Sequence, residues 1–215
     1  MRARLLARGA AFILCLALIG CGTTAGERAI YDQVLRRNAT PQPAAQFTAL
    51  NQRGAEAIVI SVEARDMATL FVRQSARDSA VHWISPDLIG VTTQQGFVTS
   101  TRGLGADLMS AETTPSAKLV LARRAGRAER HHGYLDGNEQ IEIRSFICDI
   151  SRRGPRQVDL GARNVATELM QESCINPSFQ FENLYWVATE TGEIIQSRQW
   201  ISEALGPLAL RKIIR

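Results

Sequence analysis

Short apolar runs with a period of two residues, separated by turn signals, fill most of the sequence from residue 57 onward. Ile58, Ile60 and Val62, for example, occupy every second position. This period places alternate side chains on one face of a β-strand. The links between the runs are short, and only antiparallel neighbours can be joined by so few residues. The pattern therefore predicts a mainly β domain over residues 44–215, built as an antiparallel meander.

The expected strands are short and closely spaced. They cover residues 57–63, 70–72, 81–84, 88–93, 97–101, 130–135, 141–148, 165–172, 184–189, 193–200 and 208–214. Between them, Ala106–Pro115 is expected to be a loop and Arg152-Arg153-Gly154-Pro155 a turn. Val165–Glu172 fits either a helix or a strand, and we favour a strand because its neighbours are short strands.

Short helical segments are predicted ahead of the strands. Glu27–Arg37 has apolar residues at helical spacing, and the proline-containing stretch 38–43 ends it. Ala44–Gln52 is predicted to be a second short helix, which Gly54 ends. These segments add little to the fold, whose class is set by the strands.

The N-terminus has the features of a bacterial export signal. Three arginines within the first eight residues precede the apolar run Ala10–Ile19, which is too short to cross a bilayer. The following stretch, Leu18-Ile19-Gly20-Cys21, resembles the lipobox of bacterial lipoproteins. In such proteins the cysteine receives a diacylglyceryl group, the chain is cut before it, and the new N-terminus is acylated with palmitate. The alternatives are a plain secreted protein and an uncleaved anchor.

The lipobox predicts how the chain is divided and where it resides. Residues 1–20 become a signal peptide, Cys21 becomes the lipidation site, and residues 21–43 form a lipidated tether and N-terminal segment. Residue 22 is Gly rather than the Asp that retains many lipoproteins in the inner membrane. We therefore expect the protein in the periplasmic leaflet of the outer membrane, anchored by lipid.

Charge and cysteine content narrow the function classes. The formal net charge is +4, and loss of Arg2, Arg4 and Arg8 with the signal leaves +1, so a nucleic-acid partner is not predicted. Of the four cysteines, Cys148 and Cys174 remain after processing, in an oxidising compartment. We expect them to form a disulfide, since the spacing fits neither a metal site nor a Cys-x-x-Cys redox motif.

Few residues suggest catalysis. His131 and His132 are candidate metal ligands beside Asp136, but neighbours in a strand face opposite sides, and solvated turn histidines are the preferred interpretation. Glu168 and Glu172 would form a glycosidase-type carboxylate pair only if their segment were helical. No Gly-x-Ser-x-Gly motif is present. We predict no catalytic residue, metal or cofactor.

Aromatic residues are the remaining candidates for binding. Trp83, Trp186 and Trp200 either pack in the core or stack on sugar rings. Arg198 lies two positions before Trp200, on the same face of a predicted strand, where it would meet an anionic glycan or solvent. These four residues are the candidate contacts to a ligand or partner.

Two blocks of sequence carry a resemblance to a known family. They comprise residues 83–87, 96–98 and 101–108 in the first block and 181–187, 191–194 and 197–201 in the second. With the lipobox, they resemble the YjbF/GfcB lipoproteins, a family associated with group 4 capsule and exopolysaccharide production. One departure is Asp87-Leu88, where the family usually has Asp-Gly. The resemblance implies a barrel-like β domain, which would also remove the exposed edges of an open meander.

The resemblance implies a role as well. Members of the family are not known as enzymes, and they accompany an outer-membrane β-barrel and periplasmic proteins of a polysaccharide export system. The leading hypothesis is a non-enzymatic outer-membrane lipoprotein that serves as an accessory or scaffold subunit in that export. The alternative is a polysaccharide-binding module that uses exposed aromatic residues, and a glycan hydrolase is the third hypothesis. The partners expected are the membrane, the export proteins and polysaccharide itself.

Overall fold

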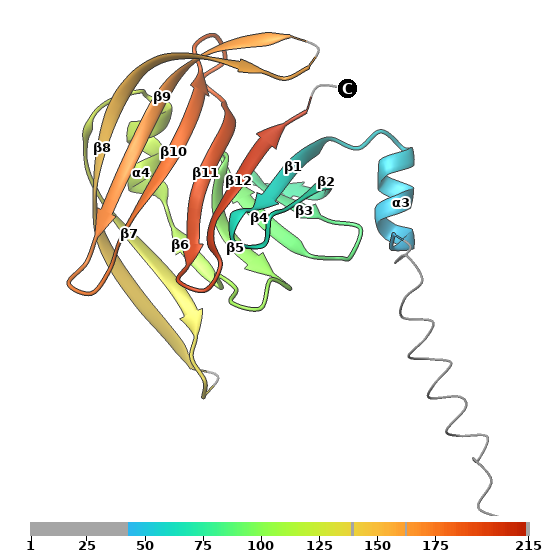
Figure 1. Ribbon diagram of the computed structural model, residues 1–215, viewed down its shortest axis with the longest axis horizontal. Helices are drawn as coiled ribbons and strands as arrows, with labels where there is room; N and C mark the ends of the chain where they lie inside the picture. The colour runs from blue at the N-terminus through green and yellow to red at the C-terminus, as the bar shows by residue number, and fades with distance from the viewer. Residues whose placement is uncertain (1–42, 139, 162, 214–215) are drawn as a thin grey trace, which may run out of the picture. The chain divides into compact units, whose positions relative to one another are not determined.

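The computed structural model describes residues 43–138, 140–161 and 163–213 (Figure 1). The predicted signal peptide, Cys21 and the predicted helix Glu27–Arg37 lie outside these residues. Within the described chain, no helix combines the length and the apolar character needed to cross a membrane.

The described residues form one antiparallel sheet with two short α-helices and one 3₁₀ turn. The strands are β1 (Ala57–Val62), β2 (Met67–Arg77), β3 (Ala80–Ile84), β4 (Gly90–Gln94), β5 (Phe97–Arg102), β6 (Ser110–Glu112), β7 (Gly126–Leu135), β8 (Ile141–Asp159), β9 (Asn164–Ile175), β10 (Gln180–Ala188), β11 (Ile194–Ser202) and β12 (Gly206–Lys212). The helical elements are α3 (Ala45–Gln52), η1 (Glu63–Arg65) and α4 (Thr114–Leu121).

The strand order is almost the order of the sequence. It runs β5-β4-β3-β2-β1-β12-β11-β10-β9-β8-β7-β6, so that β1 pairs with β12, with Ile60 opposite Leu210. The sheet curls until its two end strands approach each other, where Thr101 N donates to Leu108 O at 2.8 Å. The mainly β, antiparallel meander is confirmed, and the twelve described strands nearly close into a barrel.

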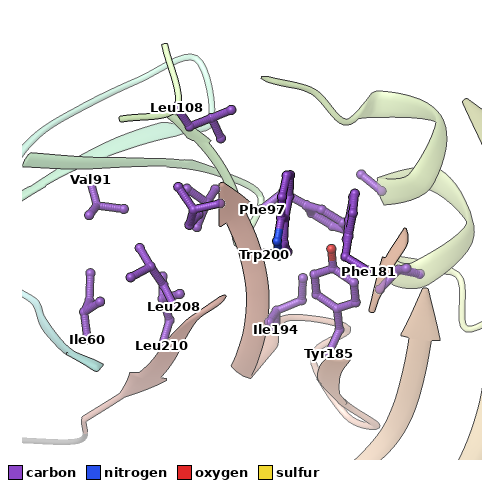
Figure 2. Close-up of a cluster of buried hydrophobic side chains, with 14 of the residues drawn as sticks. Ile60, Val91, Phe97, Leu108, Phe181, Tyr185, Ile194, Trp200, Leu208 and Leu210 are labelled. Carbon is purple, nitrogen blue, oxygen red and sulfur yellow. The ribbon is translucent and has the colours of Figure 1, made fainter. Parts of the chain in front are cut away.

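The inside of the curled sheet is filled with side chains. Figure 2 shows large residues from opposite strands meeting there, among them Phe97, Phe181, Tyr185 and Trp200. The rings of Phe181 and Trp200 stack at 4.5 Å with an interplanar angle of 11°, and those of Phe97 and Tyr185 lie 4.6 Å apart. Such an interior is a packed core rather than a channel.

Helix α3 begins and ends close to the prediction. Gly54 follows it with φ +70°, a left-handed conformation that glycine adopts without strain, and its N–H donates to Asn51 O at 3.1 Å. Phe47 is buried against Val72 and Ile84 of the sheet. One aromatic side chain thus fixes this helix to the outside of β2 and β3.

The loop predicted for Ala106–Pro115 is wrong in its second half. Strand β6 and the first residues of α4 lie there. Pro115 is compatible with the first helical turn, where its missing N–H costs nothing. Ala117 and Val120 are buried, and α4 contacts β7, β8 and β10, so tertiary packing stabilises a helix that is too short to be stable alone.

The turn predicted at Arg152-Arg153-Gly154-Pro155 is also wrong. These residues lie inside β8, a strand of 19 residues that pairs with β9 on both sides of them. Arg152 is opposite Met170 and Pro155 is opposite Glu168, so the chain between them forms a β-bulge. Gly154 has φ +87° in this bulge. Gly154 and Pro155 therefore bend strand β8, and they do not reverse the direction of the chain.

Candidate functional site

An ion pair lies in the middle of the core, and it is the most concentrated group of polar chemistry in the described chain. Arg130 on β7 donates from Nη1 to Glu172 Oε2 on β9 at 2.7 Å, and both side chains are almost fully buried. Tyr185 Oη on β10 donates to the same carboxylate oxygen at 2.8 Å and accepts from Arg130 Nη1 at 3.1 Å. Strands β7, β9 and β10 therefore contribute one residue each, and β8 lies between β7 and β9 in the sheet.

The network continues on both sides of the ion pair. Arg130 Nε donates to His132 Nε2 at 2.8 Å, so the imidazole proton lies on Nδ1, 2.9 Å from Tyr134 Oη. Tyr134 in turn donates to Ile201 O at 2.6 Å. On the other side Asn183 Nδ2 donates to Glu172 Oε2 at 2.8 Å. The polar groups are thus linked into one chain across the interior.

The burial of these groups shifts their pKa values. Burial raises the pKa of the Glu172 carboxyl, but the Arg130 charge and the hydrogen bonds outweigh this and hold it below its ordinary value. Burial lowers the pKa of His132 to about 2, helped by the Arg130 charge. Burial raises the pKa of the Tyr185 hydroxyl well above its usual range. The network therefore holds one ion pair, a neutral imidazole and two neutral phenols.

Helix α4 meets this network through Ser116. Among the described residues, Ser116 Oγ and Glu172 Oε1 are the two buried side-chain atoms without a hydrogen-bond partner. The Ser116 hydroxyl nevertheless helps to lower the pKa of Glu172, so it lies close to this carboxyl group.

The predicted disulfide joins Cys148 on β8 to Cys174 on β9, directly opposite each other in the ladder. Its sulfur atoms and a Glu172 carboxylate oxygen lie within 4.8 Å of one another, the one grouping of potential metal ligands in the described part of the chain. Because the two sulfurs are bonded to each other, they are not thiolate ligands. This grouping therefore does not form a metal site.

The histidines and glutamates considered in the sequence separate in the structure. His131 and His132 lie on β7 and not in a turn, and His132 is fully buried, so the solvated-turn interpretation is wrong for it. Glu168 and Glu172 both lie on β9, about 13 Å apart along the strand. A glycosidase pair needs a separation of about 5–10 Å. Glu172 binds Arg130 and Glu168 binds Arg152, so they form no catalytic pair.

The four predicted contact residues do not converge on one surface. Trp83 and Trp200 are buried, Trp83 donating from Nε1 to Thr93 Oγ1 at 2.9 Å. Trp186 is half-buried against a small apolar cluster that includes Ile195. Arg198 makes a two-fold ion pair with Glu63, with both N–O distances 2.8 Å.

A pocket of about 420 Å³ opens beside one of these residues. Trp83 is the one aromatic side chain among the described residues of its wall. The other large apolar residues of the lining are Ile58, Val81, Leu121, Ile194, Ile195 and Leu210. At the rim, Lys212 and Glu193 already pair at 3.2 Å. A single tryptophan with paired charges around it offers little of the stacking surface that a sugar-binding groove requires.

The outer face of β7, β8 and β9 carries an unusual feature, which we call the aliphatic row: Leu135, Ile141, Ile143, Ile147 and Ile175. These are five of the eight large apolar side chains that are exposed in the described chain, each between 42% and 65% exposed. Leu135 is opposite Ile141, and Ile147 is opposite Ile175. Exposed apolar side chains that share one face of a sheet are candidates for an interaction surface.

The polar groups along the aliphatic row are already paired. His131 Nδ1 lies 2.8 Å from Ser145 Oγ in the middle of the row, and Arg127 pairs with Asp149 at 3.0 Å at one end. Gly133 is opposite Ile143, and a Cβ there would lie 2.7 Å from Ser110 Oγ, so this position has no room for a side chain. The row is therefore an apolar surface that polar residues interrupt at His131, Ser145 and Glu129.

Comparisons with known proteins agree with this fold. The family model described as "Group 4 capsule polysaccharide lipoprotein gfcB, YjbF" matches residues 29–213. The uncharacterized lipoprotein GfcB of Escherichia coli K12 is 25% identical over 132 residues, which are 60% of this chain and 62% of that protein, so the match spans less than two thirds of the relative's length.

A solved structure shares the fold. The crystal structure of the hypothetical lipoprotein YmcC from Escherichia coli K12 superimposes with a TM-score of 0.67 over 90% of this chain and 97% of that one, at 17% identity. The family match covers far more than half of the sequence. The chain therefore belongs to the YjbF family of group 4 capsule polysaccharide lipoproteins.

Proposed function

We propose that this protein is a non-enzymatic, membrane-anchored accessory subunit of capsule or exopolysaccharide secretion, which acts as a scaffold through protein contacts. The family supports the pathway. The observation that carries the proposal is the aliphatic row, an apolar surface on the outside of a sheet whose inside is packed. The polar groups of the interior bind one another in the ion-pair network. The outer surface is therefore the part of the protein that would contact a partner.

The occupant of the aliphatic row is a partner protein rather than lipid. Segments that enter a membrane interface combine apolar residues with Trp, Tyr, Lys or Arg. The five residues of the row are all aliphatic, and Arg127 at one end is already paired with Asp149. The adjoining turn contains Asp136, whose carboxylate accepts two backbone N–H groups. An apolar patch with a paired polar rim matches the anatomy of a protein interface. We assign it to the outer-membrane β-barrel or a periplasmic protein of the export system.

The proposed anchor is lipid on Cys21, in the periplasmic leaflet of the outer membrane. Cys21 and Pro43 are 22 positions apart, which allows a reach of at most about 75 Å. A domain held this close to a membrane meets membrane-embedded partners at a raised effective concentration. The anchor thus supports a scaffold role and supplies no chemistry of its own.

The test combines a variant and a crosslink in a polysaccharide-producing strain. Ile141→Glu with Ile143→Glu should abolish polymer export at an unchanged protein level. Met67→Glu, at a similarly exposed apolar side chain on β2, is the matched control and should export normally. A photo-crosslinking residue at position 143, but not at 67, should capture a component of the export system. Export by the double variant, or crosslinks to lipid alone, would overturn the proposal.

A further inference from the structure

Four arginines gather around the bulge of β8, and we call them the arginine cluster: Arg123, Arg152, Arg153 and Arg156. Arg152 and Arg153 precede Gly154 in the bulge and Arg156 follows it, while Arg123 comes from the end of α4. Arg152, Arg153 and Arg156 are exposed. The cluster lies where β8 and β9 leave the rest of the sheet as a long hairpin (Figure 1).

One carboxylate, that of Glu168 on β9, lies beside two of these arginines, Arg152 and Arg123. Arg152 donates to it from Nε at 3.2 Å and from Nη2 at 3.1 Å, and Gly154 N donates at 3.1 Å. The Arg152 hydrogen bonds hold the pKa of Glu168 below its usual value, and the charge of Arg123 acts in the same direction. Arg156 Nη1 lies 3.9 Å from the place that a Cβ on Gly154 would occupy. The bulge is thus a site that binds a carboxylate, and Glu168 fills part of it.

The other three arginines have no carboxylate partner among the described residues. Arg123 donates to the carbonyl oxygens of Ala188 and Thr189, at 3.1 and 3.0 Å, and Arg156 donates to the neighbouring Pro155 O. Arg153 donates to the Gln171 amide. Of the four arginines, only Arg152 therefore pairs with a carboxylate among the described residues, and Arg123 acts on the same carboxylate through its charge.

The nearby acidic groups are occupied elsewhere. Asp159, in the turn of the hairpin, accepts from Gly161 N at 2.8 Å. Glu182 on β10 binds the side chains of Gln171 and Ser173. Neither carboxylate forms an ion pair with an arginine of the cluster among the described residues.

We propose that the arginine cluster binds an acidic polysaccharide, one that carries carboxylate or phosphate groups along its chain. The inference rests on the proposed function, since it names a ligand within the same pathway. A guanidinium presents a planar fork of N–H donors that matches a carboxylate or a phosphate. Several forks on one hairpin bind a polymer with repeated negative charges at several points together.

The hairpin favours a polymer over a membrane surface. A hairpin that enters lipid exposes large apolar side chains at its turn. Among the described residues of the turn between β8 and β9, Leu160 is the one large apolar residue, and it is buried with Val158 against Ile195. The hairpin therefore offers charge to a ligand and keeps its apolar side chains for its own packing.

Glu168 acts as a built-in competitor in this proposal. It occupies the fork of Arg152 that a ligand carboxylate would otherwise use. Glu168→Gln removes that negative charge with little change of shape, so it should raise the affinity for an acidic polymer several-fold. Arg153→Glu with Arg156→Glu should lower the affinity at least about tenfold, since two attractive charges become repulsive. Opposite effects from two variants at one site are hard to produce by misfolding.

The experiment measures binding of the full chain, purified in neutral detergent, to immobilised alginate, a polyuronate, and to dextran, a neutral polymer of matched size. We expect binding to alginate alone, and expect 300 mM NaCl to weaken it strongly relative to 50 mM. Arg77→Glu with Arg102→Glu is the control, because it changes net charge equally at two exposed arginines outside the cluster. Circular dichroism and thermal unfolding check the fold of each variant.

Four results would overturn the inference: no binding to alginate, equal binding to dextran, an equal loss in the control variant, or unchanged binding in the cluster variant. Binding to phosphatidylglycerol vesicles in place of alginate, lost in the cluster variant, would assign the cluster to the membrane instead. None of these results bears on the scaffold proposal, which is tested separately with variants of the aliphatic row in cells. Failure of that test would in turn leave alginate binding unchanged.

Discussion

The two faces of strands β7, β8 and β9 each carry some residues of the kind usually found on the other face. The inner face holds the ion pair of Arg130 and Glu172, whereas the outer face exposes the isoleucines of the aliphatic row. The inner charges are paired and hydrogen-bonded, so they are tolerated in the core. The outer side chains stay exposed to water in the described part of the chain. The difference shows that the inner charges find their partners within this chain, and it supports the proposal that the outer face binds another molecule.

The largest expected effect comes from breaking the inner ion pair. Arg130→Ala should lower the free energy of unfolding by about 3–5 kcal/mol, because it leaves the Glu172 carboxylate buried without its cation. Urea denaturation measures this loss. Arg77→Ala, at a side chain that is 92% exposed, is the control and should stay within about 0.5 kcal/mol of the parent. A loss below about 1 kcal/mol for Arg130→Ala would mean that water reaches the network and that the Glu172 carboxylate does not depend on Arg130.

The disulfide lies beside the same ion pair and ties β8 to β9. Replacing both Cys148 and Cys174 by Ala should cost about 3 kcal/mol of unfolding free energy, since the bond closes a loop of 26 positions. Reduction of the parent protein should produce a similar loss in the same denaturation experiment. An unchanged urea midpoint after confirmed reduction would show that the pairing of β8 with β9 holds these strands together without the disulfide.

A smaller effect is expected from acid. The folded state keeps His132 neutral, with a pKa of about 2, whereas the unfolded chain protonates it below its ordinary value of 6.5. The unfolded state therefore binds more protons between these values, and stability falls as the pH falls through this window. Between pH 7 and pH 5 the loss should be about 2 kcal/mol.

The variant His132→Gln provides the control for this pH dependence. Its amide oxygen can still accept the hydrogen bond from Arg130, but it has no group that titrates in the window. The slope of unfolding free energy against pH should become nearly flat between pH 7 and pH 5. A slope as steep as in the parent would assign the effect to other groups. Glu172, whose pKa is lowered, acts in the same direction at more acidic pH, below its ordinary value of 4.5.

The sequence predicts the strands better than it predicts their faces. Short apolar runs between turn signals locate β1, β5 and β11 to within a few residues. In β8, both sets of alternate positions contain apolar residues: Ile141 and Ile143 on one side, Phe146 and Cys148 on the other. Alternation there indicates a strand without showing which side is buried. The outer row of isoleucines could therefore not be located before the sheet was known.

The inner network was missed for a different reason. Arg130 and His132 stand in a run where the intervening residues, Glu129 and His131, are also polar, so neither face looks apolar. Glu172, the partner of Arg130, lies 42 positions away. Only the pairing of β7 with β8 and of β8 with β9 brings them together. One weak signal was present in the sequence. Ala128, Arg130, His132 and Tyr134 occupy every second position, which places them on one face of a strand, and the first and last of the four are apolar or aromatic.

The smallest expected effect is on the outer face, and it is the most direct test of the comparison. Ile143→Thr should change the free energy of unfolding by less than about 0.5 kcal/mol, because this side chain is 58% exposed and loses little contact when its size and polarity change. Threonine keeps the β-branched shape that the strand favours. Phe146→Ala, three positions along the same strand but on the buried face, should cost about 3–5 kcal/mol. If Ile143→Thr were as costly as Phe146→Ala in the purified chain, the outer face would be part of the core rather than a surface awaiting a partner.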